Sequence, residues 1–164
     1  MKKSLLSFAF VLAFATVASA APRFGVIGEQ SAGIGAFITD DMYNAQVTFA
    51  SNSDDATQKT ENTAIKLGGN YKIALDSMTA LTAGISYTMV SGKGSLQDGS
   101  AFEYDTNNTL AIVAGFERAL SSNIVLTADI DLYSQNTLKM KSGSGETKTT
   151  KLFEDVSFGI AYLF

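Results

Sequence analysis

The feature that most limits the fold of this chain is a strict alternation of apolar residues with small or polar ones. Between Leu81 and Met89 every second residue is apolar or aromatic, and the residues between them are Thr82, Gly84, Ser86 and Thr88. A period of two residues predicts a β-strand with one apolar face and one small, polar face. The same pattern recurs over 65–75, 110–116 and 124–133, so the chain is expected to be all-β.

Eight strands are expected from this pattern and from the turns that interrupt it. They lie at 23–28, 31–39, 43–51, 62–75, 78–91, 106–118, 123–140 and 152–164. The first two depend on a turn at Gly28-Glu29-Gln30, since the same stretch could form one long strand. An up-and-down barrel with both ends on one side requires an even number of strands, which favours the turn.

The connections between these strands alternate in length. Tight turns are predicted at Asp40-Asp41, at Asp76-Ser77 and at 121–123, where Asp, Ser and Asn side chains can bond to their own backbone. Longer polar loops are expected to start at Ser51, Gly92 and Lys141. Short turns at one end and long loops at the other are typical of outer-membrane barrels.

The first twenty residues have the layout of a secretory signal peptide. Lys2 and Lys3 precede an apolar stretch, which ends on the small residues Ala18-Ser19-Ala20. The stretch is shorter than the ~20 residues that a membrane helix needs, which disfavours the alternative of a retained anchor. The expected organisation is therefore a signal peptide at 1–20 and a single barrel domain at 21–164.

Composition excludes several classes of function. The 12 basic residues include Lys2 and Lys3, so 10 remain against 16 acidic residues, and nucleic acid is an unsuitable partner. The chain has no cysteine, which excludes disulfides, thiol catalysis and thiolate metal sites. It also has no histidine, the commonest acid–base group of enzymes. The Asp129-x-Asp131 pair offers only a weak acid–base alternative, so no catalytic, cofactor or metal residue is predicted.

The small face of the strands decides between a barrel in lipid and a soluble barrel. It carries Gly68, Asn70, Gly84, Ser86, Gly115, Ser157, Gly159 and Ala161, which suit a narrow interior better than a water-facing exterior. The charges within the strands share that face: Lys66, Lys72, Glu117, Asp129, Asp131 and Asp155. The expected fold is an eight-stranded antiparallel up-and-down transmembrane β-barrel, with its charges in the lumen.

These lumen charges, Lys66, Lys72, Glu117, Asp129 and Asp131, have two interpretations. A low dielectric would favour pairing between them, so a structural network that fills the interior is the preferred one. A gated path for ions or protons is the alternative. An eight-stranded barrel has room only for its own side chains, which argues against a wide pore.

The last nine residues carry a more specific signal. Val156, Phe158, Ile160, Tyr162 and Phe164 alternate with small residues, and the stretch resembles the C-terminal assembly signal of bacterial outer-membrane proteins in Phe158, Ile160, Tyr162 and Phe164. Together with the expected leader and strands, the chain resembles the small eight-stranded barrels of the OmpX type and of the OmpA transmembrane-domain type.

This resemblance implies a non-enzymatic protein of the outer membrane with a role in envelope integrity or surface adhesion. It implies no cofactor. The implied partners are outer-membrane lipid and lipopolysaccharide, with the barrel assembly machinery and periplasmic chaperones during biogenesis. The alternatives are a narrow conduit for small solutes and a soluble, lipocalin-like periplasmic binder. Four lysines in the last long connection, Lys139, Lys141, Lys148 and Lys151, could contact lipopolysaccharide phosphates, although a flexible solvated hairpin is the preferred interpretation.

Overall fold

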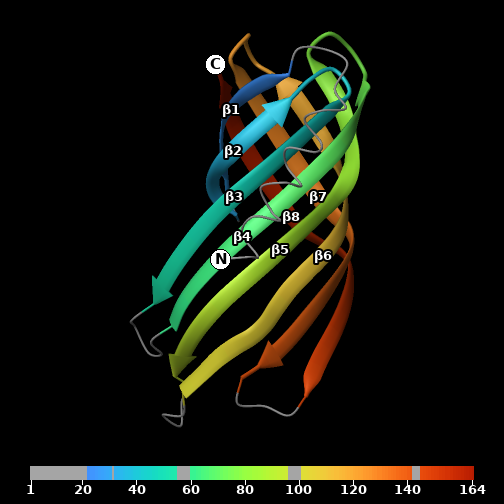
Figure 1. The fold of residues 1–164 in the computed structure, drawn as a ribbon. Helices are drawn as coiled ribbons and strands as arrows, with labels where there is room; N and C mark the ends of the chain where they lie inside the picture. Colours follow the sequence, from blue (N-terminus) through green and yellow to red (C-terminus); the bar gives the residue numbers. More distant parts are fainter. Residues whose placement is uncertain (1–21, 31, 55–59, 96–100, 142–144) are drawn as a thin grey trace.

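The chain forms one closed antiparallel barrel in which each strand pairs with its neighbours in sequence (Figure 1). A computed structural model describes residues 22–30, 32–54, 60–95, 101–141 and 145–164. The strands are β1 (Arg23–Glu29), β2 (Gly33–Thr39), β3 (Tyr43–Asp54), β4 (Thr60–Ala74), β5 (Thr79–Ser95), β6 (Ala101–Ala119), β7 (Ile124–Met140) and β8 (Glu146–Leu163). The expected all-β, eight-stranded architecture is confirmed. The expected leader at 1–20 lies outside the described residues.

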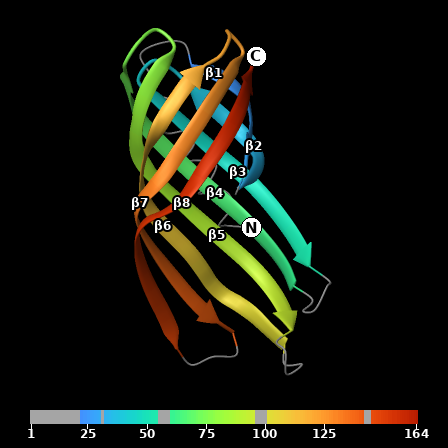
Figure 2. The same ribbon diagram turned by 180° about the vertical axis from the view of Figure 1, so that it is seen from behind.

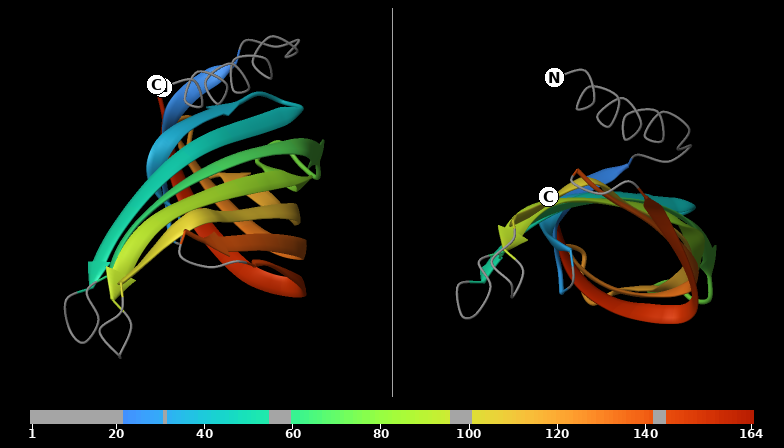
Figure 3. Two further views of the ribbon diagram at one scale, coloured as in Figure 1. Left: turned by 60° about the horizontal axis from the view of Figure 1, so that its bottom comes forward. Right: turned by 90° about the horizontal axis from the view of Figure 1, so that it is seen from below.

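The ring closes where β1 pairs with β8, from Gly25 opposite Leu163 to Glu29 opposite Gly159. The view from below shows the strands enclosing a lumen (Figure 3). Among the described residues, no helix is long and apolar enough to cross a bilayer.

The short connections follow the predicted turn chemistry. The Oδ1 atom of Asp40 accepts hydrogen bonds from the backbone N–H groups of Met42 and Tyr43, at 2.6 and 2.7 Å. Asp76 repeats this arrangement with Met78 and Thr79, both at 2.7 Å. Backbone hydrogen bonds to a carboxylate stabilise the charged form of the group. The bond from Met78 is therefore the main reason why the pKa of the exposed Asp76 lies below its ordinary value.

The strands at the other end are longer than the sequence predicted. Residues expected in loops, including Ser51–Asp54, Gly92–Ser95 and Glu146–Lys151, continue the strand pairing. They remain in register because each segment pairs with a neighbouring strand that extends as far, as from Thr60 opposite Gly94 to Ala74 opposite Ala80. The predicted β1–β2 turn is also placed too early, since Glu29 is the last residue of β1.

The two faces of the barrel wall have opposite character. Large apolar side chains point outward on every strand; on β8, Val156, Phe158, Ile160, Tyr162 and Phe164 are each 54–75% exposed. On the same strand Ser157, Gly159, Ala161 and Leu163 point inward and are buried. The predicted orientation is therefore correct for β8, because neighbouring residues of a strand point to opposite faces.

The prediction that Asp155 lies on the lumen face is wrong, and a β-bulge explains it. The β7–β8 register shifts between Ile130 and Asp131, and Asp155 in this bulge is exposed, with a φ of 47°, rather than on the lumen face. A second bulge, in the β6–β7 register, moves Tyr133 to the outer face opposite Ile112. A bulge inserts one extra residue and so reverses which face the following residues point to.

A cluster of apolar side chains also lies in the lumen, where the sequence predicts only small and charged residues. Ile27, Phe37, Val125, Ala161 and Leu163 pack together and are all at most 3% exposed. They come from β1, β2, β7 and β8, the strands on either side of the closing ladder. The part of the lumen beside the closing ladder is thus apolar, although Glu29 on β1 and Asp129 and Asp131 on β7 come from two of the same strands.

Candidate functional site

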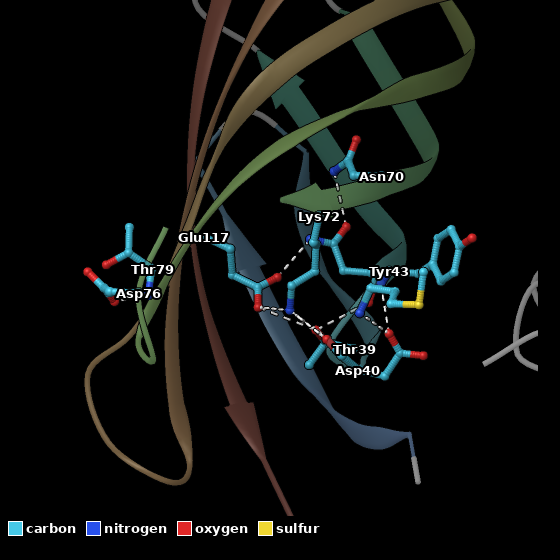
Figure 4. A network of polar contacts seen from close by, with 10 residues as sticks. Thr39, Asp40, Tyr43, Asn70, Lys72, Asp76, Thr79 and Glu117 are labelled. Atoms are coloured by element: carbon cyan, nitrogen blue, oxygen red, sulfur yellow. Dashed lines mark hydrogen bonds and ion pairs between the residues drawn. The ribbon is translucent and has the colours of Figure 1, made fainter. Parts of the chain in front are cut away.

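A group of polar side chains surrounds Lys72 and Glu117 in the lumen (Figure 4). The Lys72 Nζ atom lies 2.6 Å from Glu117 Oε1, and both side chains are 9% exposed. The same Nζ donates to Thr39 Oγ1 at 2.9 Å and to the Asp40 carbonyl oxygen at 2.7 Å. All three donor positions of the ammonium group therefore have acceptors.

Glu117 is equally well supplied with donors. Its Oε2 atom accepts a hydrogen bond from Asn44 Nδ2 at 2.7 Å, and its Oε1 atom accepts one from Thr39 Oγ1 at 3.3 Å. Asn70 Nδ2 in turn donates to Asn44 Oδ1 at 3.0 Å. We call Thr39, Asn44, Asn70, Lys72 and Glu117 the lower cluster. It crosses the lumen from β2, β3 and β4 to β6, close to the short turns.

A second ion pair lies farther from the short turns and joins Lys66 to Glu29. The Glu29 side chain is only 2% exposed, and its Oε2 atom also accepts a hydrogen bond from Gln46 Nε2 at 2.9 Å. Glu29 is the last residue of β1, so these contacts connect the tip of the β1–β2 hairpin to β3 and β4. Burial without such partners would be costly for a carboxylate.

Asp129 and Asp131 lie on β7, directly opposite Gly115 and the buried Val113 of β6. Asp129 Oδ1 accepts a hydrogen bond from Thr82 Oγ1 at 3.4 Å. Gly115 lies opposite Asp129 in the register, and a Cβ atom on Gly115 would stand 2.4 Å from Asp129 Oδ1. The glycine thus leaves the space that the aspartate side chain occupies. Gly84 does the same for Asn70, whose Oδ1 atom would be 2.3 Å from an added Cβ.

Among the five predicted lumen residues, all of which lie in the described part of the chain, only Lys72 and Glu117 form an ion pair with each other. Lys72 pairs with Glu117, Lys66 pairs with Glu29, and the two aspartates lie on β7. Sequence reasoning missed Glu29, Thr39, Asn44 and Gln46. Extending the alternation Gly25, Ile27, Glu29 by one step would have placed Glu29 in the lumen, and the misplaced turn concealed it.

The four lysines proposed to contact lipopolysaccharide lie near the long-loop end, on β7, β8 and the connection between them. Three have carboxylate partners: Lys141 with Glu103 at 2.5 Å, Lys148 with Glu146 at 3.2 Å, and Lys151 with Glu154 at 2.6 Å. The bond to Glu154 raises the pKa of Lys151. Lys139, next to the last residue of β7, lies opposite Glu146 in the register. Local pairing thus offsets much of the positive charge of this rim.

Among the residues that the structure describes, no group of three or more Asp or Glu side chains could hold a metal ion.

Comparison with known proteins now bears on the fold. No protein-family model matches the sequence, and no curated protein matches it. Among solved structures, the chain is similar to Neisserial surface protein A, with a TM-score of 0.54, 16% identity, and coverage of 87% of this chain and 96% of that one. It also matches Ail, the attachment invasion locus protein of Yersinia pestis, with a TM-score of 0.48, 13% identity and the same coverage.

The chain has the fold of the small eight-stranded outer-membrane β-barrels. The likeness to Neisserial surface protein A spans most of both chains, at an identity that speaks for fold alone. The apolar outer face, the closed ladder and the charged lumen are the features that this fold requires in a bilayer.

Proposed function

We propose that this protein is a non-enzymatic barrel of the bacterial outer membrane that presents its long-loop end at the cell surface. One observation carries the proposal: a closed ring of strands turns its large apolar side chains outward and its ionised side chains inward. Phe158 and Ile160, at 55% and 60% exposure, would be costly in water in such numbers, whereas hydrocarbon accepts them. This orientation also argues against a soluble, lipocalin-like binder, whose apolar face would line the interior.

The lower cluster supports a surface role over a conduit. Lys72, Glu117, Thr39 and Asn44 join opposite sides of the lumen through bonds of 2.6–3.3 Å. A path for solutes would have to break several buried charge-assisted bonds at once. Recordings from purified protein in planar bilayers should therefore show no steady openings, and regular single-channel steps would favour the conduit.

The proposed orientation can be tested by labelling on intact cells, because the chain has no native cysteine. Lys93→Cys places a thiol near the long-loop end, where the lysine side chain is 68% exposed. Arg118→Cys places one at the exposed short-turn end and serves as the matched control. A membrane-impermeant maleimide should label Lys93→Cys on intact cells, and Arg118→Cys only after the outer membrane is permeabilised.

The opposite labelling pattern, or equal labelling in a soluble periplasmic extract, would overturn the proposed location. Slower migration of the heated than of the unheated protein on a denaturing gel would independently indicate a closed barrel.

If the protein lies in the outer membrane, its partners are outer-membrane lipid and lipopolysaccharide. The residues nearest the outer headgroups would then be Lys139, Lys141, Lys148 and Lys151. The assembly role proposed for Phe158, Ile160, Tyr162 and Phe164 has support in their common outward direction on the closing strand. Such a row could be read by the barrel assembly machinery while β8 is still unpaired. Periplasmic chaperones would cover the same apolar face before insertion.

A further inference from the structure

Two carboxylates of the lumen have no lysine partner among the described residues. Asp129 and Asp131 lie on β7, between β6 and β8 (Figure 2). Asp131 faces the buried Val113 of β6, and residues that face each other in a pair of strands point to the same side. Asp129 accepts one long hydrogen bond, from Thr82 at 3.4 Å, and Asp131 accepts none within the described part of the chain.

The lysines near these aspartates are already paired. Lys66 interacts electrostatically with both aspartates, but its charge is offset by Glu29. The other ion pair of the lumen belongs to the lower cluster. Glu154, which faces Asp131 from β8, pairs with Lys151. Two negative charges in this part of the lumen therefore have no described lysine to offset them.

A fully buried hydroxyl group lies across the lumen from these carboxylates. Thr48 is on β3, four strands away from β7 in either direction around the ring. It points inward, because Gln46, two residues earlier on β3, reaches Glu29 in the lumen. Thr48 is 0% exposed, and its Oγ1 atom has no hydrogen-bond partner. It faces Lys66 in the register, so it lies beside the ion pair that interacts with both aspartates.

A second oxygen without a partner is directed toward the aspartates. Asn70 Oδ1 is buried and accepts no hydrogen bond. It lies over Gly84, and Asp129 Oδ1 lies over Gly115, since added Cβ atoms would be 2.3 and 2.4 Å from these oxygens. Gly84 faces Val113, two residues from Gly115, so the two glycines are diagonal neighbours on β5 and β6. The amide oxygen from β4 and the carboxylate from β7 therefore approach each other over residues without side chains.

These oxygens suit a hard cation. Carboxylate and amide oxygens only accept hydrogen bonds, so together they lack donors. Calcium binds about six to eight such oxygens, including waters, in a flexible geometry, and two carboxylates match its charge. A site with two carboxylates and neutral oxygens differs from the groups of three or more acids considered above. The lower cluster blocks the lumen toward the short turns, so an ion would enter from the long-loop end.

We propose that Asp129 and Asp131, together with Asn70 and Thr48, form a binding site for one divalent cation inside the barrel, with Ca²⁺ as the ion that fits best. The carboxylates would bind the ion directly, and the two neutral side chains would bind it directly or through its waters. The ion would link β7 to β3 and β4 across the lumen. The site depends on the geometry of the lumen and not on the proposed location of the protein.

The test is an NMR titration of the ¹⁵N-labelled barrel with Ca²⁺ in phosphocholine micelles, whose headgroups carry no net charge. Amide signals of Asp129, Asp131 and Thr48 should shift and saturate, with a dissociation constant of about 1 mM or below. Mg²⁺ should bind at least about tenfold more weakly, because it requires a regular octahedron and releases its waters reluctantly. The absence of saturable shifts at these residues up to about 10 mM Ca²⁺, or equal affinity for Mg²⁺, would overturn the proposal.

A pair of variants tests the role of the carboxylates. Asp131→Asn keeps the shape of the side chain and removes one charge, so the calcium affinity should fall at least about tenfold. Glu61→Gln is the matched control, because it removes the same charge from a side chain that is 64% exposed on β4. Its calcium affinity should stay within about twofold of the unsubstituted protein. Equal affinities of the two variants would contradict a site at Asp131.

Thr48→Val separates binding of the ion from packing. In a chelator the urea midpoint of this variant should not fall, since the hydroxyl group has no hydrogen bond to lose, whereas its calcium affinity should fall about threefold. A lower midpoint in chelator with unchanged calcium affinity would exclude Thr48 from the site.

Stability gives an independent measurement of the same binding. About 10 mM Ca²⁺ should lower the unfolding equilibrium constant of the unsubstituted barrel about tenfold, and that of Asp131→Asn by less than about twofold. Equal shifts for both proteins would place the bound calcium elsewhere and refute the site. Heat-modifiable migration shows separately whether each variant is folded, so a failed calcium test leaves the barrel assignment intact.

Discussion

The lower cluster makes a quantitative prediction for Lys72→Met. Methionine keeps an unbranched side chain but removes an ammonium group that lies 2.6–2.9 Å from three acceptors. Glu117, a residue only 7% exposed, would keep just the neutral donors Asn44 and Thr39. Removing one partner of a buried ion pair typically costs about 3–5 kcal/mol, because the other charge stays buried.

We expect the lower end of this range, about 3 kcal/mol, because two neutral hydrogen bonds to Glu117 survive. With a slope of about 2 kcal/mol per molar urea, the unfolding midpoint in lipid vesicles should fall by about 1.5 M. The double variant Lys72→Met/Glu117→Gln should recover at least about 1 kcal/mol of this loss, since no buried charge is then left alone.

Lys93→Met is the matched control for the ion pair. Lys93 lies 3.1 Å from Glu61, but both side chains are more than 60% exposed, so its loss should cost less than about 0.5 kcal/mol. Equal midpoints for Lys72→Met and Lys93→Met would refute the view that the lower cluster stabilises the barrel.

Three further outcomes follow from the structure. Gly115→Ala should lower the urea midpoint markedly, because its Cβ atom would lie 2.1 Å from the Ala128 carbonyl oxygen, whereas Gly28→Ala, with nothing within 4 Å, should change it little. The folded-state pKa of Asp76 is lowered, so its turn should contribute stability above the unfolded-state pKa and lose it as the pH falls through the folded-state pKa; Asp76→Asn should remove this part of the acid dependence. Phe164→Ser should reduce outer-membrane incorporation in cells while leaving refolding into vesicles nearly unchanged, and equal loss in both assays would contradict a role in assembly.

Much of the fold could be predicted because the bilayer imposes a period-two pattern. The alternation of Phe158, Ile160 and Tyr162 with small residues indicates which face of β8 points outward. The short turns at Asp40 and Asp76 could be recognised because Asp side chains can accept hydrogen bonds from the nearby backbone. The bulges at Asp155 and near Tyr133 could not, since an extra residue leaves no mark in composition. The ends of the strands could not be predicted for a related reason, since Thr147 and Thr149 suit a loop and a paired strand equally well.

The sequence predicts which residues belong to the candidate site, but not which of them pair with each other. Alternation places Lys66, Lys72, Glu117, Asp129 and Asp131 in one lumen, yet which lysine meets which carboxylate depends on the register around the ring. Lys72 meets Glu117 because β4 and β6 both lie next to β5, with Lys72 opposite Thr82 and Glu117 opposite Ala80. That relationship exists only after closure, so no local sequence signal contains it.

The shortness of β1 also affects how the ring is held shut. The eight strands form a closed ring only through the β1–β8 ladder. This ladder runs from Gly25 to Glu29, with one further backbone hydrogen bond at each end, whereas the β7–β8 ladder extends over nearly the whole of both strands. On unfolding, the strands should therefore separate first at this seam, and on folding, this ladder should be the last to form. The ion pair of Glu29 with Lys66 and its hydrogen bond from Gln46 tie the last residue of β1 to β4 and β3, so they hold the end of β1 in the ring without crossing the seam itself.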